Sequence, residues 1–186
     1  LFEDGNLQDK QAENIAEVMS IIEHLVRLNK SLLLLSKIEN KQFLDNQSVL
    51  LNKVVQKNIG DLEEIANFKN VNLSLIESTE LFVQMDSSLA SVIISNLLKN
   101  AIFHNLSNGK VSVEIFENII KISNTSKAQK LDENLIFNRF YKPNNSSKGT
   151  GLGLAIVKAI SDLYGFKVSY SHNNALHCFQ VEFPAT

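Results

Sequence analysis

The chain has 186 residues, of which 44% are hydrophobic and 20% charged, and its 18 basic and 20 acidic side chains give a formal net charge of −2. These proportions are typical of a globular protein and exclude a wholly disordered chain or a fibrous repeat. The near-neutral balance also argues against a basic nucleic-acid surface, so no nucleic-acid partner is expected.

The cysteine count and the hydropathy of the chain indicate the environment in which it folds. Cys178 is the only cysteine, which excludes an internal disulfide framework and a thiolate zinc cluster and favours a reducing, cytosolic environment. No apolar run approaches the roughly 20 residues that cross a bilayer. The chain begins Leu1-Phe2-Glu3, without Met and without the order of a signal peptide, so we expect a fragment of a longer protein.

The amino-terminal region predicts one long helix. Pro and Gly are absent from Leu7 to Asn40, and apolar residues recur there at spacings of three, four and seven. This pattern predicts a helix of roughly 30 residues, about 45 Å long. Its Leu32–Leu35 run is apolar on almost every face, so we expect it to pack in a helical hairpin or a dimeric bundle.

Strands and helices alternate after a polar linker at Lys41–Gln47. The predicted strands are Ser48–Leu51, Val71–Ile76, Leu81–Met85, Val111–Phe116, Ile119–Ser123, Lys167–Ser171 and His177–Phe183, and the predicted helices are Lys53–Phe68, Ser87–Phe103 and Gly151–Tyr164. This order predicts an α/β (α+β) two-layer sandwich, in which helices cover one face of a mixed sheet.

Two carboxamides stand out on the helix predicted at Ser87–Phe103. Asn96 and Asn100 share one face with Ile93, at the rim of the apolar stripe. Burying an unpartnered amide costs roughly 1–3 kcal/mol, so a polar partner is expected. Mg²⁺ is one such partner, because it takes one or two protein oxygens and completes its shell with phosphates and water. On spacing alone, both could instead cap loops or bind structural water.

Glycines are concentrated just before the last predicted helix. Gly149, Gly151 and Gly153 are three of the chain's seven glycines. They permit close backbone approach, and a helix amino terminus favours anions, so phosphate binding is the natural use. Tight turns that precede helices often have a similar glycine-rich sequence, so a structural turn is the alternative interpretation. Neither the Rossmann nor the Walker pattern fits.

A third pattern precedes the glycines. Ile136–Lys142 contains three aromatic residues and leads into a polar stretch that ends at Lys148. It predicts an anchored segment followed by a mobile loop, whose Lys142 and Lys148 could close over phosphates. The plainer interpretation is a surface loop pinned by a core Phe.

In this order the three patterns resemble the catalytic ATP-binding domain of sensor histidine kinases, which has the Bergerat-type ATPase fold. NLLKNA (96–101) matches the asparagine box, LIFNRFYK (135–142) the phenylalanine box and GTGLGLAIVK (149–158) the second glycine box. SLLLLSKIEN (31–40) is similar to the end of the second helix of the family's dimerisation and phosphotransfer hairpin. The resemblance assigns 1–45 to that helix and a linker, and 46–186 to the catalytic domain.

The resemblance implies roles for individual residues. It implies that Asn100 ligates Mg²⁺ and that Asn96 lines the same pocket. Phe137 and Phe140 would anchor a lid, and His104 falls where the family has His or Tyr, although an exposed helix-end imidazole explains it equally. The implied ATP contacts are Asn96, Asn100, His104, Asn124, Arg139, Lys142, Gly149, Thr150, Gly151, Leu152 and Gly153.

Two positions depart from the family pattern. The first glycine box usually reads Asp-x-Gly-x-Gly, and its Asp accepts a hydrogen bond from the adenine amine. Here Asn124 stands in the Asp position and no glycine follows. A neutral acceptor makes a weaker bond than a charged one, so lower adenine affinity is expected. Phe103 also stands where the asparagine box often has Lys.

The family's phosphoacceptor segment has no counterpart here. His24 lies on the long predicted helix without the Arg-Thr-Pro that follows the acceptor in the family, and we interpret it, like His172 and His177, as a packed or surface histidine. No catalytic residue is assigned, and the chain alone is not expected to phosphorylate itself.

The function that the resemblance implies is transfer of the ATP γ-phosphoryl group to a histidine and then to an Asp of a response regulator receiver domain. It also implies a homodimer through a helical bundle and a cytoplasmic domain of a bacterial membrane-bound sensor, attached only through upstream segments. The alternatives are another Bergerat ATPase, which would carry Glu in place of Asn96, and a nucleotide-poor regulatory module. In isolation, the Leu32–Leu35 face is expected to be buried by non-native assembly or against the chain's own domain.

Overall fold

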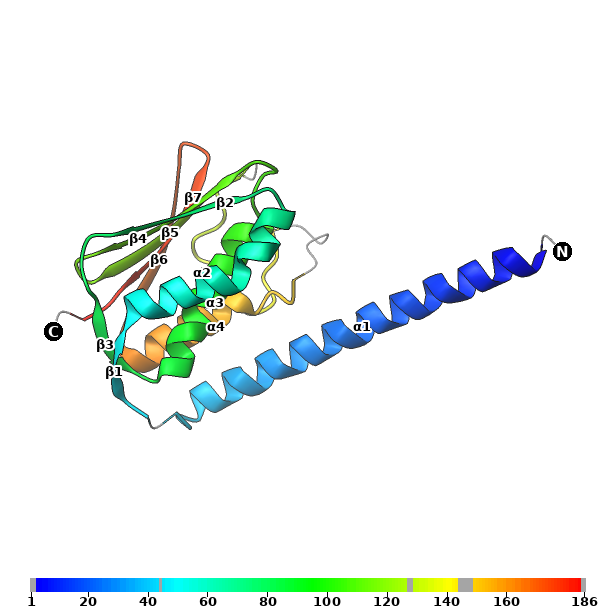
Figure 1. The fold of residues 1–186 in the computed structure, drawn as a ribbon. Helices are drawn as coiled ribbons and strands as arrows, with labels where there is room; N and C mark the ends of the chain where they lie inside the picture. The colour runs from blue at the N-terminus through cyan, green and yellow to red at the C-terminus, as the bar shows by residue number, and fades with distance from the viewer. Residues whose placement is uncertain (1–2, 44, 127–128, 144–148, 185–186) are drawn as a thin grey trace.

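The computed structural model describes residues 3–43, 45–126, 129–143 and 149–184 (Figure 1). Its helices are α1 (Glu3–Glu39), α2 (Leu51–Phe68), α3 (Ser87–Phe103) and α4 (Gly153–Tyr164). Its strands are β1 (Gln47–Leu50), β2 (Asn72–Glu77), β3 (Phe82–Met85), β4 (Lys110–Phe116), β5 (Ile119–Thr125), β6 (Lys167–Asn173) and β7 (Leu176–Glu182). Every predicted element is present.

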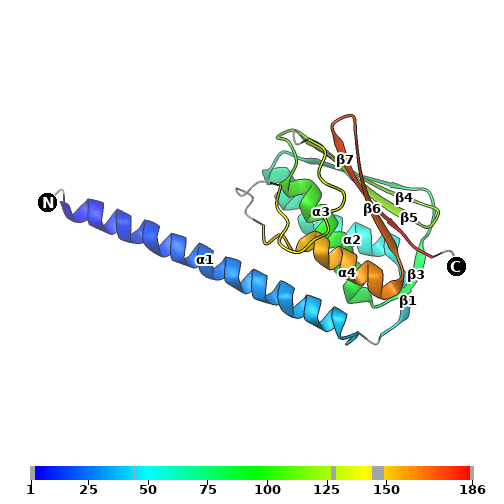
Figure 2. The ribbon, with the colours of Figure 1, turned by 180° about the vertical axis from the view of Figure 1, so that it is seen from behind.

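A mixed sheet forms one layer of the domain. Five strands run in the order β2-β4-β5-β7-β6, and only the β2–β4 pair among them is parallel, while β1 and β3 form a separate antiparallel pair. In β4, Val111, Val113 and Ile115 are fully buried and alternate with half-buried residues, as expected for a strand with one covered face. Helices α2, α3 and α4 cover that face (Figures 1 and 2). The predicted two-layer α/β sandwich is therefore confirmed.

Helices α3 and α4 run antiparallel in the second layer. The Asp86 side chain caps α3 by accepting hydrogen bonds from the Ser88 and Leu89 amides at 2.7 and 3.2 Å. The Asp86 amide donates to the Tyr164 hydroxyl at 3.1 Å, which joins the start of α3 to the end of α4. This pairing brings the start of α4 beside the second half of α3.

Helix α1 projects away from the domain and touches it only near its carboxyl end (Figures 1 and 2). Leu35 and Ile38 are 2% exposed against the domain, whereas Leu33 is 56% exposed. The Leu32–Leu35 face is therefore buried against the chain's own domain only in part. No helix in the described part of the chain is both long and apolar enough to span a membrane.

Helix α4 begins two residues later than predicted. Gly151 has a φ of +73°, a left-handed conformation that cannot belong to a right-handed helix, so the helix starts at Gly153. It ends at Tyr164 and is followed by Gly165, whose φ of +72° forms a left-handed cap.

Candidate nucleotide-binding site

Asn96 and Gly153 meet at the junction of α3 and α4. The Asn96 Nδ2 donates to the Val92 carbonyl oxygen at 2.8 Å. Its Oδ1 faces Gly153, because a Cβ atom on that glycine would lie 2.9 Å from the oxygen. The amide row on α3 (Asn96 and Asn100) and the glycine segment (149–153) are separate in the sequence. They are adjacent in the structure. Asn100 is half-buried one turn further along the same face of α3.

A backbone hydrogen bond joins the glycine segment to the phenylalanine segment (136–142). The Phe140 amide donates to the Gly151 carbonyl oxygen at 2.9 Å. A Cβ atom on Gly151 would lie 2.8 Å from the Phe140 Cα and carbonyl carbon. The left-handed φ and this close approach both require glycine at 151. A Cβ atom on Gly149 would meet nothing within 4 Å, so sterics do not require that glycine.

Thr150 and Leu152 belong to the turn that starts α4. The Leu152 amide donates to the Thr150 hydroxyl at 3.4 Å. Leu152 is fully buried, so it packs in the core at the start of α4. Helix amino termini leave amide groups without partners inside the helix and carry a partial positive charge, which suits phosphate oxygens.

The predicted anchoring role of Phe140 is wrong. Its side chain is 56% exposed and its φ is +62°, so its backbone rather than its ring makes the connection to Gly151. Ile136, at 3% exposure, and the partly buried Phe137 pack on the core instead. Lys142 is half-buried, and Lys148 lies outside the described residues.

Arg139 has a partner that the sequence did not suggest. Its guanidinium forms an ion pair with the Glu39 carboxylate, at the last residue of α1, and both side chains are about half exposed. A hollow of about 460 Å³ lies beside this pair, between α1, the phenylalanine segment and α4. The phosphate contact predicted for Arg139 competes with this ion pair for the same guanidinium.

Asn124 lies near the end of β5, facing the helical layer. It is 2% exposed and is flanked by Val111 on β4 and His177 on β7. His177 is 4% exposed, and its Nδ1 lies 2.7 Å from the Tyr170 hydroxyl. The buried Tyr170–His177 pair was missed by sequence reasoning, because the pairing of β6 with β7 is what brings the two rings together.

The remaining histidines are at three places. His104 is exposed at the carboxyl cap of α3, and its amide donates to the Asn100 carbonyl at 3.1 Å. Desolvation and the nearby Lys69 charge lower the pKa of His104. His24 is half-buried on α1. The His172 ring is tilted by 47° relative to the His177 ring, and the two ring centroids lie 4.6 Å apart.

The donor set decides what kind of metal would fit. Within the described ranges, no group of three or more His, Cys, Asp or Glu side chains is placed to hold a metal ion. The Asn100 carboxamide lies one turn along α3 from Asn96, which contacts Gly153. An amide oxygen of this kind instead fits Mg²⁺ that arrives with phosphates and keeps several of its waters.

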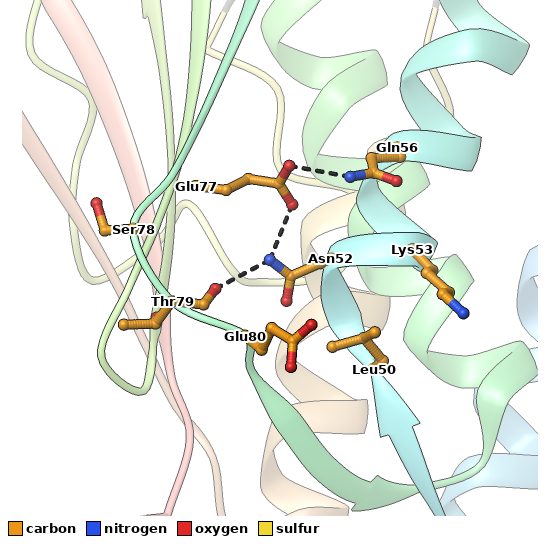
Figure 3. A pocket seen from close by; sticks show the side chains of 8 residues that line it. All are labelled: Leu50, Asn52, Lys53, Gln56, Glu77, Ser78, Thr79 and Glu80. Carbon is orange, nitrogen blue, oxygen red and sulfur yellow. Dashed lines mark hydrogen bonds between the residues drawn. The ribbon is translucent and has the colours of Figure 1, made fainter.

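A polar cavity lies away from these residues. It measures about 430 Å³ and lies between the start of α2 and the β2–β3 loop (Figure 3). There the Glu77 carboxylate accepts from the Asn52 and Gln56 amides at 2.8 and 2.9 Å. Asn52 also donates to the Thr79 carbonyl at 3.0 Å and accepts from the Leu81 amide at 2.9 Å. These bonds join α2 to the loop and indicate a structural role.

The family comparison agrees with the geometry. The family described as "Histidine kinase-, DNA gyrase B-, and HSP90-like ATPase" matches residues 85–186. The chain is 30% identical to the heme sensor protein HssS of Staphylococcus saprophyticus over 98% of its own length, and 28% identical to the sensor histidine kinase HprS of Escherichia coli over 92%. It spans about two fifths of those relatives, 41% and 39% respectively.

Solved structures agree as well. The catalytic domain of the histidine kinase ThkA superposes with a TM-score of 0.66 at 26% identity, covering 77% of this chain and 97% of that one. The Acinetobacter baumannii histidine kinase AdeS superposes with a TM-score of 0.74 at 24% identity, covering 92% and 84%, and supports the fold. The chain therefore belongs to the histidine kinase-, DNA gyrase B- and HSP90-like ATPase family, as a homologue of sensor histidine kinases.

Proposed function

We propose that this chain is the ATP-binding catalytic part of a two-component sensor histidine kinase. In the intact protein it would transfer the ATP γ-phosphoryl group to a histidine, from which a response regulator Asp would receive it. The observation that carries this proposal is the approach of Gly153 to the Asn96 Oδ1, because it unites an amide row with a glycine-rich helix start.

Different residues of the proposed site would contact different parts of the nucleotide. Backbone amides of 149–153 would bind phosphate oxygens at the start of α4. Asn100 would ligate Mg²⁺, and Asn96 would line the same pocket. Asn124 would accept a hydrogen bond from the base, while Lys142 and Arg139 are candidates for phosphate contact. His104 would flank the site at the end of α3.

Phosphoryl transfer asks for positioning and charge neutralisation more than for covalent chemistry from the protein. Bound Mg²⁺ would supply neutralisation of the phosphate charge. The chain's own contribution is a fixed backbone: Gly151 is bonded to Phe140, and Asn96 is held by Val92. The first bond restricts the segment that would hold the phosphates, and the second fixes the orientation of the Asn96 side chain.

A relative solved in a complex and the exposed apolar face of α1 support two kinds of partner. The ThkA kinase has been solved in complex with the response regulator TrrA, which supports a receiver-domain partner here. Apolar side chains on α1 such as Ile15, Met19, Ile22 and Leu25 are more than half exposed, which supports a homodimer through a helical bundle in the intact kinase.

We assign 1–45 to the hairpin helix and linker and 46–186 to the catalytic domain. Attachment to a membrane would come from segments outside this chain.

A titration with a fluorescent ATP analogue tests the proposal. We expect saturable binding that requires Mg²⁺ and that Asn100→Ala weakens by about tenfold or more. The matched control is Asn67→Ala, which removes an exposed carboxamide from α2. Absence of binding at millimolar nucleotide would contradict the proposal and favour a regulatory module that binds no nucleotide.

A further inference from the structure

Helix α3 extends past the start of α4. Gly153, the first residue of α4, lies beside Asn96, and α3 continues from there to Phe103. This continuation is almost two turns, or roughly 10 Å, long. Because the two helices run antiparallel, the free amide groups at the start of α4 point in the direction in which α3 continues. An anion bound to those amides would therefore lie beside the last two turns of α3.

The face of α3 that borders this space ends in an aromatic ring. Positions 96, 100 and 103 fall on one side of a helix, so Phe103 follows the amide row of Asn96 and Asn100. Ala101 and Ile102 are 0% and 1% exposed in the core, whereas Phe103 is 52% exposed. The Phe103 ring is therefore open to solvent on the side of the amide row.

Lys69 places a positive charge on that ring. It is the carboxyl cap of α2, and its Nζ lies 5.1 Å from the centre of the Phe103 ring. The carboxyl ends of α2 and α3 lie side by side, on the side of the domain where α4 begins (Figures 1 and 2). After desolvation, the Lys69 charge is the second cause that lowers the pKa of His104, the residue next to Phe103. Lys69 therefore extends the amide row although it belongs to another helix.

The Lys69 charge is available for a ligand. Within the part of the chain that the structure describes, Lys69 forms no ion pair with an acidic side chain. A cation–π contact at an exposed site is weak, and the lysine side chain is flexible. Hydrogen bonds between an ammonium group and phosphate oxygens are stronger, because both partners are charged. The ammonium group can therefore exchange the ring for a phosphate.

We propose that Lys69, which stacks on Phe103, binds the phosphate chain of the nucleotide and so increases the preference of the site for nucleotides with more phosphates. This inference rests on the nucleotide site proposed above. It adds a residue of α2 to that site and makes Phe103 a positioning residue, which holds the ammonium group beside the amide row.

The experiment measures ATP, ADP and AMP as competitors of a fluorescent ATP analogue. Lys69→Ala should weaken ATP binding by about tenfold, because a charged hydrogen bond is lost, and should change AMP binding by less than about twofold. Lys69→Arg keeps the charge and should retain the ATP-to-AMP ratio, which shows that the loss in Lys69→Ala comes from the charge and not from misfolding. The matched control is Lys57→Ala, which removes an exposed lysine earlier on α2 and should change neither affinity.

The role of Phe103 is tested by combining two substitutions. Phe103→Leu keeps an apolar side chain but removes the ring, and should weaken ATP binding by about threefold. In the Lys69→Ala background it should have no further effect, since no ammonium group remains to be held. Equal losses of ATP and AMP affinity in Lys69→Ala would overturn the proposal, as would unchanged ATP affinity or additive effects of the two substitutions. An unaltered chain that binds none of the three nucleotides would instead refute the nucleotide site itself, and this inference with it.

Discussion

Arg139 and Glu39, which are 100 positions apart in the sequence, form an ion pair between the phenylalanine segment and the end of α1. The residue after Arg139 is bonded through its amide to Gly151. The Glu39–Arg139 ion pair, the Phe140–Gly151 bond and the approach of Gly153 to Asn96 therefore form a continuous series of contacts. This series connects the end of α1 with the proposed nucleotide site.

Neutralising the two partners separately tests what Arg139 does. An exposed ion pair contributes at most about 1 kcal/mol, so neither Arg139→Ala nor Glu39→Ala should change the unfolding temperature appreciably. Arg139→Ala should weaken ATP binding by about tenfold, because a charged hydrogen bond to phosphate is lost. Glu39→Ala should not weaken binding, because it releases the guanidinium. Equal effects of the two changes on affinity, measured by analogue titration, would show that Arg139 serves only the contact with α1.

Gly153→Ala tests the junction of α3 and α4. The added methyl group would lie 2.9 Å from the Asn96 Oδ1, so the carboxamide or the helix start must move. We expect nucleotide affinity to fall by about tenfold or more, since sub-ångström misplacement at a site is costly. Gly60→Ala is the matched control: it meets nothing within 4 Å and should leave affinity unchanged while stabilising α2 by about 0.5–1 kcal/mol. If Gly153→Ala left nucleotide affinity unchanged, the contact between Asn96 on α3 and Gly153 on α4 would not contribute to nucleotide binding.

Elements with a clear periodicity could be predicted from the sequence, and the reason is local. The alternation in β4 and the Pro-free apolar repeat of α1 depend only on residues within each element. The approach of Gly153 to Asn96 agrees with what the family resemblance implied for the two motifs, whereas the residue spacing alone left other roles open. The boundaries of α4 were less accurate, since the left-handed Gly151 is a property of the turn rather than of the helix.

Other features depend on tertiary placement and leave no local pattern. The Glu39–Arg139 pair requires that the end of α1 lie beside the phenylalanine segment, which no spacing encodes. Phe140 was misjudged because an aromatic residue beside a core segment usually packs inward, yet here its backbone conformation turns the ring outward. The side-chain hydrogen bonds that join Asn105 and Thr125 to the Lys110 backbone were missed because their only local sign is Gly109, a residue that also occurs in ordinary turns.

Asp86→Ala measures how much the α3 cap contributes. Loss of an Asp cap costs about 1 kcal/mol, and Asp86→Asn should retain most of it because its oxygen still accepts. Desolvation opposes ionisation, but hydrogen bonds from Ser88 and Leu89 lower the pKa of Asp86 overall. The cap's contribution is therefore present at pH 7 and lost as pH falls through that lowered pKa. Urea unfolding should show a gap between the unaltered chain and Asp86→Ala at pH 7 that narrows in acid, and a gap independent of pH would contradict this account.

Incubation of the purified chain with ATP and Mg²⁺ tests the absence of an acceptor. The sequence has no segment like the family's phosphoacceptor, and His24 lies on a largely exposed stretch of α1 far along the helix from the Leu35 and Ile38 contact. Since phosphoryl transfer requires the nucleophile within about 3–3.5 Å of the reacting atom, we expect no acid-labile phosphate on the chain. The control is nucleotide binding by the same preparation, which shows that the domain is intact. Robust acid-labile labelling that His24→Ala removes would identify His24 as the acceptor and would require α1 to approach the site in a different arrangement.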